Sequence, residues 1–274
     1  MRKGDKKRML IENTLFGKIN KVEQAIAKIR LHEPANGYYV AFSGGKDSCV
    51  ILDLIKRAGV KYDAHYNVTT VEPPELLKFI HDYHRDVIIE KPEMPMYKLI
   101  EKKGVLPTRF FRYCCAVYKE RGGIGRTVVT GIRKAESNSR SKRSMVEPCN
   151  RHSNKQFLHP IIDWSTEDVW EYIKTYNVPY CELYDKGWQR IGCVGCPFAS
   201  PQQRKQDLEQ YPHIEKMWKY GCQKINDKRK APGKELIFET ANDMYEWWLS
   251  GKSLSTAKPE EINLFGLLMD EGST

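Results

Sequence analysis

The chain has 274 residues, of which 41% are hydrophobic and 29% charged, and its formal net charge is +10. This composition is typical of a globular protein, and no apolar run reaches the roughly 20 residues that a membrane-spanning helix needs. The basic segment 1–8 has no apolar signal core behind it, so we expect a cytoplasmic protein without membrane contact.

The first two-thirds of the chain alternate between helical and strand patterns. Apolar spacing predicts a helix over 14–32 with Thr14 as its N-cap, followed by a strand at 38–42 and a helix at 47–58. Strands are expected at 62–68, 87–89 and 127–131, and helices at 75–84 and 96–103. This alternation predicts an α/β fold with a doubly wound, mainly parallel sheet, in which ligands bind at the carboxyl ends of the strands.

The remaining segments are more polar. Residues 134–156 are basic with few apolar anchors, which predicts a mobile loop over the site. Ser165 and Asp168 resemble a capping box that starts a helix ending near 175. Helices at 202–209, 213–229 and 241–249 predict a helical C-terminal extension. We therefore expect an N-terminal helix (1–36), a nucleotide-binding α/β domain (37–198) and a helical extension (199–274).

Residues 43–48 read Ser-Gly-Gly-Lys-Asp-Ser, between the strand at 38–42 and the following helix. Gly44 and Gly45 let backbone N–H groups approach an anion, and the N-terminus of the helix points its positive end at the same place. The hydroxyls of Ser43 and Ser48 and the ammonium of Lys46 add donors. The spacing matches neither the P-loop nor the dinucleotide fingerprint. The segment therefore predicts a phosphate site of another class, with an ordinary Gly-Gly turn as the alternative.

Four of the eight cysteines form a pattern. Cys114 and Cys115 are adjacent, and Cys193 and Cys196 form a Cys-x-x-Cys. Such a set in a chain without a signal segment indicates metal ligands or thiols rather than disulfides. Four thiolates fit a [4Fe–4S] cluster, and a tetrahedral zinc or no metal at all are the alternatives. Adjacent side chains diverge and chelate one ion poorly, which favours the cluster with its separate iron corners.

These motifs resemble those of a known family. Ser-Gly-Gly-x-Asp-Ser resembles the PP-loop of nucleotide alpha-hydrolases, which include ATP pyrophosphatases, thiolation enzymes and sulfonucleotide reductases. The pattern Cys-Cys followed by Cys-x-x-Cys resembles adenylylsulfate reductases of the phosphoadenylylsulfate (PAPS) reductase family, as do segments 130–133 and 159–164. The similarity covers roughly 36–198. It implies an adenine nucleotide alpha-hydrolase-like fold that binds ATP or a sulfonucleotide beside a [4Fe–4S] cluster, with Mg²⁺ accompanying ATP.

The resemblance also implies roles for individual residues. The residues that it makes catalytic are Lys46, Asp47 and Lys119. The residues that it makes nucleotide- or phosphate-binding are Ser43, Gly44, Gly45, Lys46, Asp47, Ser48, Gly131, Arg133 and Arg140. A solvated basic face is the alternative for the two arginines, and a surface position is the alternative for Lys119.

One departure from the family decides the expected reaction. The reductases carry a C-terminal Glu-Cys-Gly-Leu-His segment whose cysteine attacks sulfur, and this sequence has none; Cys222, in a different context, is the remaining candidate nucleophile. We therefore expect an ATP pyrophosphatase or adenylylating enzyme in a sulfur-transfer pathway (thiolation or phosphorothioation). The alternatives are an adenylylsulfate or phosphoadenylylsulfate reductase that releases sulfite, and a non-catalytic nucleotide or redox sensor. Expected partners are a nucleic-acid substrate on the basic segment 133–143 and a sulfur donor such as a cysteine desulfurase or thioredoxin.

Overall fold

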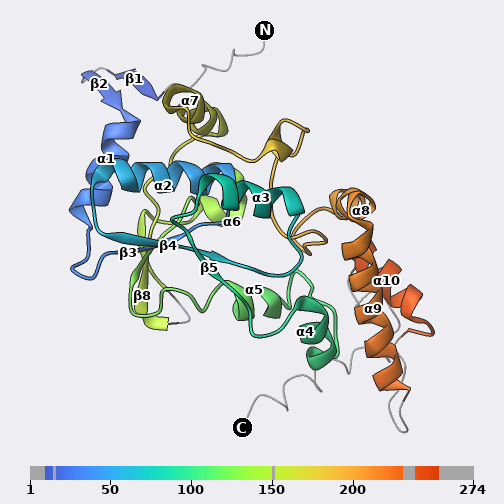
Figure 1. Ribbon diagram of the computed structural model, residues 1–274. Helices are drawn as coiled ribbons and strands as arrows, with labels where there is room; N and C mark the ends of the chain where they lie inside the picture. Colours follow the sequence, from blue (N-terminus) through green and yellow to red (C-terminus); the bar gives the residue numbers. More distant parts are fainter. Residues whose placement is uncertain (1–9, 15–16, 150–151, 231–237, 253–274) are drawn as a thin grey trace. The chain divides into compact units, whose positions relative to one another are not determined.

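The computed structural model describes residues 10–14, 17–149, 152–230 and 238–252. The chain divides into two compact units (Figure 1). The first contains the chain up to Val68, Glu72–Pro92 and Tyr118–Gly192; the second contains Thr69–Val71, Glu93–Val117 and the chain from Cys193 onward. Within the described residues, no helix combines the length and the hydropathy that crossing a membrane would require.

A six-stranded sheet forms the centre of the first unit, with the strand order β5-β4-β3-β6-β8-β7. Every neighbouring pair is parallel except β7 and β8, which are antiparallel at one edge. The strands are β3 (Tyr38–Ala41), β4 (Tyr62–Asn67), β5 (Ile88–Glu90), β6 (Thr127–Val129), β7 (Val146–Cys149) and β8 (His152–Leu158). The prediction of an α/β fold with a mainly parallel sheet is confirmed.

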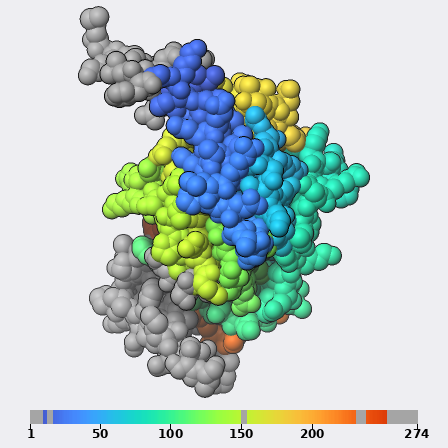
Figure 2. Space-filling model, turned by 90° about the vertical axis from the view of Figure 1, so that its left-hand side faces the viewer, coloured from blue at the N-terminus to red at the C-terminus, as the bar shows by residue number. Residues whose placement is uncertain are grey.

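Helices flank this sheet. The longer ones are α1 (Lys21–Leu31), α2 (Lys46–Ala58), α3 (Pro74–Tyr83) and α7 (Thr166–Tyr176). Helices α1, α2 and α3 lie on one side of the sheet, and α1 packs against α2 (Figures 1 and 2). The core between them contains Ile29, Val40, Leu54 and Ile55, none of which is exposed. Each such side chain contributes about 1.5–3 kcal/mol by leaving water, so the core holds the start of α2 firmly in place.

The strand order reverses next to β3. From β3 the chain proceeds outward through β4 to β5, and then returns to β6 on the opposite side of β3. The carboxyl ends of β3 and β6 therefore flank the point where the strand order reverses. Open α/β sheets bind ligands at this point.

Two expectations about local structure were wrong. The first long helix begins at Lys21, not at 14, because β1 (Ile11–Thr14) and β2 (Gly17–Asn20) form an antiparallel hairpin. Asn20, rather than Thr14, is the N-cap, and its side chain accepts hydrogen bonds from the first turn. Segment 134–156 is not one loop, since it contains η1 (Lys134–Glu136), α6 (Asn138–Ser141), β7 and the start of β8. The polar strand β7 is tolerated because it lies at the edge of the sheet, where Pro148 breaks no inner ladder.

The described part of the second unit is helical. It contains α4 (Met96–Lys103), most of α5 (Tyr113–Tyr118), α8 (Pro201–Gln210), α9 (Pro212–Arg229) and α10 (Ala241–Ser250). Helix α9 packs against α4, α8 and α10. Trp218 and Trp248 stack with their ring centroids 4.6 Å apart, and the indole N–H of Trp248 donates to the carbonyl of Pro107 (2.8 Å). The three helices predicted for the C-terminal extension are thus present.

Candidate functional site

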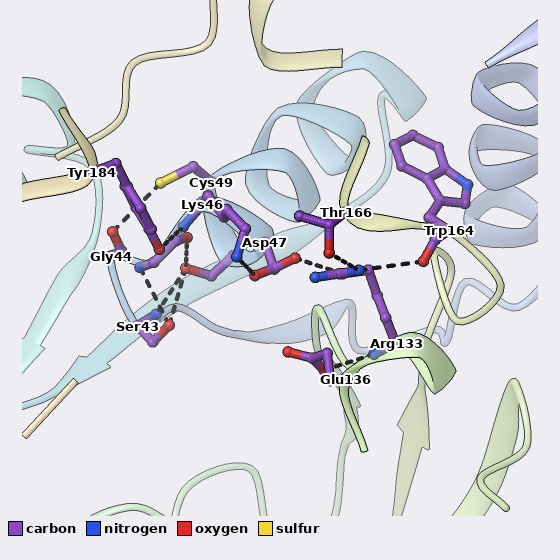
Figure 3. Close-up of polar contacts among 12 residues, drawn as sticks. Ser43, Gly44, Lys46, Asp47, Cys49, Arg133, Glu136, Trp164, Thr166 and Tyr184 are labelled. Carbon is purple, nitrogen blue, oxygen red and sulfur yellow. Dashed lines mark hydrogen bonds and ion pairs between the residues drawn. The ribbon is translucent and has the colours of Figure 1, made fainter. Parts of the chain in front are cut away.

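The loop after β3 has a backbone that requires glycine. Gly44 has φ +71°, and a Cβ atom built there would lie 2.5 Å from Cδ1 of Leu76 on α3. Both the left-handed conformation and the lack of space exclude a side chain. Gly45 is the N-cap of α2, so the loop leads directly into the N-terminus of that helix (Figure 3). The predicted strand–loop–helix arrangement is therefore present in the structure.

Two serine hydroxyls hold this loop together. The hydroxyl of Ser48 donates to the carbonyl of Gly45 (2.8 Å) and accepts from the backbone N–H of Ser43 (3.2 Å). The hydroxyls of Ser43 and Ser48 lie 3.2 Å apart, and that of Ser43 also accepts from the N–H of Gly45 (3.4 Å). Both side chains thus organise the loop from within, as well as standing beside the expected anion.

Tyr184 meets the loop from η2 (Glu182–Tyr184). The backbone N–H of Lys46 donates to the Tyr184 hydroxyl (3.0 Å), and the Lys46 ammonium lies 5.5 Å from the centre of the tyrosine ring. Burial raises the pKa of Tyr184 above its ordinary value, so the phenol stays neutral. The hydroxyl oxygen therefore satisfies an N–H in the first turn of α2, where the helix dipole attracts negative partners (Figure 3).

Asp47 lies between two cations. One carboxylate oxygen is 3.1 Å from the Lys46 ammonium, and the other accepts from Nε of Arg133 at 2.6 Å. The side chain of Arg133 is only 2% exposed, and its guanidinium also donates to the carbonyl of Trp164 and the hydroxyl of Thr166, both at 3.4 Å (Figure 3). In the structure Arg133 pairs with Asp47 at the first turn of α2, and its predicted role in nucleotide binding stays a prediction.

The end of β6 approaches the same turn. A Cβ atom at Gly131 would lie 2.9 Å from the backbone carbon and oxygen of Asp47, so glycine permits this contact. Arg140 on α6 pairs with Glu136, whose carboxylate accepts from the backbone N–H of Arg133 (3.0 Å). Arg140 is thus linked to the loop through Glu136 and Arg133.

Two other basic side chains of the segment 133–143 also have carboxylate partners. Lys134 pairs with Asp163 at 2.7 Å, and Arg143 pairs with Glu147. A nucleic-acid substrate on this segment stays a prediction, and these ion pairs leave less unpartnered positive charge there than the sequence suggests.

The four patterned cysteines all belong to the second unit. Cys114 and Cys115 lie on α5, while Cys193 and Cys196 lie on the turn after the first unit. The pKa of Cys114 is raised, first by a hydrogen bond with Cys115 and burial, and then by the negative potential of Cys115, Cys193 and Cys196. Two distant segments therefore bring these sulfur atoms into electrostatic reach of one another. All eight cysteines are thiols, and the described residues include no group of three or more side chains arranged to hold one metal ion.

Two further residues were candidates for catalysis. Lys119 is exposed in the turn after α5. Cys222 is fully buried in α9, and burial raises its pKa to about 12. A buried, protonated thiol is a poor nucleophile, so in this conformation Cys222 does not meet the requirements of an attacking group.

Sequence reasoning missed the contacts that complete the site. The pairing of Tyr184 with Lys46 spans 138 positions, and neither residue signals it locally. His159, directly after β8, hydrogen-bonds Thr130 directly after β6, because those two strands are neighbours. The strand order explains the contact between Thr130 and His159, whereas the contact between Tyr184 and Lys46 depends on how η2 folds back onto the loop.

Comparisons with known proteins agree with this architecture. The family model of the phosphoadenosine phosphosulfate reductase domain matches residues 37–199. An uncharacterized protein of Methanocaldococcus jannaschii is 32% identical over 189 residues, which are 65% of this chain and 46% of that protein. The adenosine 5'-phosphosulfate reductase of Oceanobacillus iheyensis is 31% identical over 167 residues, covering 57% of this chain and 69% of that one. A probable FAD synthase of Caenorhabditis elegans is 30% identical over 203 residues, covering 69% of this chain and 36% of that one.

Among solved structures, phosphoadenylyl-sulfate (PAPS) reductase from Candida auris aligns with a TM-score of 0.49 and 21% identity, covering 63% of this chain and 89% of that one. The chain spans less than half the length of the M. jannaschii relative and of the FAD synthase.

Proposed function

Because the chain belongs to the phosphoadenosine phosphosulfate reductase domain family, we propose that it is a PP-loop enzyme that binds an adenine nucleotide with its phosphates at loop 43–48. We further propose that it cleaves ATP between the α- and β-phosphates, transferring the AMP moiety to an acceptor oxygen and releasing pyrophosphate, as a step of a sulfur-transfer pathway in which a sulfur donor later displaces AMP. The acceptor and the sulfur donor stay predictions.

One observation carries the nucleotide proposal. The Ser43–Ser48 loop has the backbone of an anion site, with Gly44 in the left-handed region and a buried lysine, at the point where the strand order reverses. The names of the relatives add support. Adenosine 5'-phosphosulfate and FAD both contain adenosine 5'-phosphate joined through phosphorus to a second group, so both names indicate a pocket for an adenosine 5'-phosphate moiety.

Catalysis would depend on electrostatic stabilisation of the leaving group, without a covalent intermediate on the protein. An acceptor oxygen attacks the α-phosphorus, the bond from that phosphorus to the bridging oxygen breaks, and pyrophosphate leaves with the electron pair. Lys46 and the N-terminal N–H groups of α2 would neutralise the negative charge that develops on the leaving group. Mg²⁺ is commonly held by one or two carboxylates together with substrate phosphates. The partly exposed Asp47 fits that role, and the ion would supply further positive charge.

We also propose that Cys114, Cys115, Cys193 and Cys196 hold a [4Fe–4S] cluster. Their proximity supports this, as does the buried Arg204, which lies near Cys196 and donates to the carbonyl of Pro197 (3.0 Å). A cluster suits the adjacent Cys114 and Cys115 better than a single zinc ion, because thiolates on neighbouring residues can bind separate iron atoms. When bound, the cluster would supply an electron or a binding place for sulfur.

Metal content tests the cluster. Protein reconstituted anaerobically with iron and sulfide should be brown and contain about four iron atoms per chain. Cys114→Ser should lose the colour, whereas Cys149→Ser, a control on β7, should keep it. Colourless wild-type protein with stoichiometric zinc would rule the cluster out.

Pyrophosphate release from ATP with Mg²⁺ tests the reaction. We expect Lys46→Met to lower the rate by about 100-fold or more, as loss of a charge-stabilising donor does elsewhere. Lys56→Met is the matched control, since Lys56 is half-exposed on the same helix and pairs with Asp86. Release of sulfite from adenosine 5'-phosphosulfate, without pyrophosphate from ATP, would instead identify a reductase. That outcome would require a thiol other than the buried Cys222, such as one from thioredoxin. Nucleotide binding without either product would identify a sensor.

A further inference from the structure

A chain of hydrogen bonds runs from the end of β6 to the edge of the sheet. The hydroxyl of Thr130 lies 2.7 Å from Nδ1 of His159, and Nε2 of His159 lies 3.3 Å from a carboxylate oxygen of Glu147 on β7. Backbone hydrogen bonds hold Thr130 and His159 in place, because the N–H of Thr130 donates to the carbonyl of Leu158 and the N–H of His159 donates to the carbonyl of Met145. His159 is fully buried, whereas Thr130 is partly exposed.

The position of Thr130 links this chain to the phosphate loop. Thr130 immediately precedes Gly131, whose backbone touches that of Asp47 at the start of α2. Thr130 also stands at the carboxyl end of β6, which neighbours β3. Thr130 therefore lies at the strand ends where the nucleotide phosphates are proposed to bind.

The state of His159 decides which way the Thr130 hydroxyl donates. The backbone N–H of Ile132 approaches the Thr130 oxygen at 3.4 Å, so that oxygen already faces one donor. If neutral His159 carries its proton on Nε2 and donates to Glu147, then Nδ1 is an acceptor and takes the Thr130 proton. If His159 is protonated, Nδ1 becomes a donor to the Thr130 oxygen, and the Thr130 proton is released to point at another acceptor.

We propose that Thr130 donates a hydrogen bond to a phosphate oxygen of the bound nucleotide, and that His159 positions this hydroxyl by taking up a proton when the nucleotide binds. The proposal rests on the nucleotide site of the proposed function and adds a coupled proton to it. Glu147 then accepts from the second N–H of the imidazolium, so the added charge has a partner inside the protein.

The surroundings keep His159 neutral until an anion arrives. Burial lowers its pKa, and the positive charges of Arg143 and Arg140 lower it further, while Glu147 raises it. Arg143 lies 3.5 Å from Nε2 of His159 and pairs with Glu147, so the carboxylate is shared. A nucleotide phosphate adds negative charge on the Thr130 side, and this favours protonation.

Calorimetry tests the coupling. The Mg²⁺ complex of α,β-methylene-ATP is titrated into the full chain at pH 7.0 in two buffers with different ionisation enthalpies, which yields both the dissociation constant and the number of protons taken up. We expect Thr130→Val to weaken binding by about tenfold, the size of a lost hydrogen bond to a charged group. Its proton uptake should fall below that of the wild type, and Thr130→Ser should restore both quantities. The ligand's own protonation cancels in the comparison between variants.

The variant His159→Gln distinguishes two possible roles of His159. One is to position the Thr130 hydroxyl for the nucleotide, and the other is only to join β6 to β8. This variant should abolish the excess proton uptake and weaken nucleotide binding, while Thr130→Ser keeps the wild-type melting temperature. If the wild type binds and both Thr130→Val and His159→Gln match it in affinity and proton uptake, the hydrogen-bond chain only joins two strands and the inference fails. If the wild type itself binds no nucleotide, the proposed function fails first.

Discussion

His84 should make the folded protein sensitive to mild acid. It follows α3, is 5% exposed, and packs against the rings of Phe42 (4.7 Å between centroids) and Phe79 (5.0 Å). Neither ring nitrogen has a hydrogen-bond partner among the described residues. Burial, aided by the positive charge of Lys56, lowers its pKa from 6.5 to about 4. The folded state therefore binds fewer protons than the unfolded chain between these two values.

The sign and size of the effect follow from this difference. The stabilisation is complete above pH 6.5 and is lost as the pH falls toward 4, because only the unfolded chain takes up the proton. At pH 5 the loss amounts to about 2 kcal/mol of the free energy of unfolding, and below pH 4 it approaches about 3 kcal/mol. His84→Leu removes the titrating ring at similar volume and should remove this loss.

Urea unfolding at pH 7.5 and pH 5.0, followed by far-ultraviolet circular dichroism, measures the difference. Between the two conditions, the free energy of unfolding of His84→Leu should rise relative to the wild type by about 2 kcal/mol. Titrations of all other groups are common to both proteins and cancel. His81→Leu, at an exposed histidine on the same helix, is the control and should follow the wild type. Parallel pH dependences of His84→Leu and the wild type would show that the ring is not held neutral, and would refute the reasoning.

Three further predictions concern the loop and its supports. Gly131→Ala places a Cβ atom 2.9 Å from the backbone of Asp47 and should weaken nucleotide binding by calorimetry, whereas Gly192→Ala, where nothing lies within 4 Å, should not. Arg133→Leu removes one of the two cations beside the partly exposed carboxylate of Asp47 and should lower the free energy of unfolding in urea by about 1.5–3 kcal/mol, the range for a hydrogen bond to a charged group; equal stability of the variant would show that the pair contributes nothing. Ser165→Ala removes the N-cap of α7 and should cost about 1 kcal/mol, visible as a lower melting temperature.

The parts of the fold that local chemistry encodes were predictable. The helix after the phosphate loop, the capping box of Ser165 and the alternation of strands and helices all depend on neighbouring residues. Strand β8 and its partner β7 were not predicted, because β7 is a polar edge strand whose pairing depends on distant residues. The hairpin before α1 was missed for a related reason, since its apolar residues fit a helical stripe as well as a strand pair.

The candidate site likewise contains one feature that the local sequence predicts and several contacts that depend on distant residues. Loop 43–48 is a single segment with a local backbone requirement, so the residue pattern predicts it. The contacts of Asp47 with Arg133 and of Lys46 with Tyr184 join residues 86 and 138 positions apart. The sequence alone could assign Arg133 to the site. It could not predict the contact with Asp47, because that contact depends on how two distant segments pack.

The carboxylate within the phosphate loop has a consequence for selectivity. The Lys46 ammonium already faces Asp47 at 3.1 Å, so an incoming anion competes with a tethered one. A singly charged ion such as chloride gains little binding free energy when it replaces the Asp47 carboxylate at Lys46. A chain of phosphates brings several negative charges to the same helix end at once. For the proposed nucleotide site, this pair predicts selection of ligands by their charge rather than by their size.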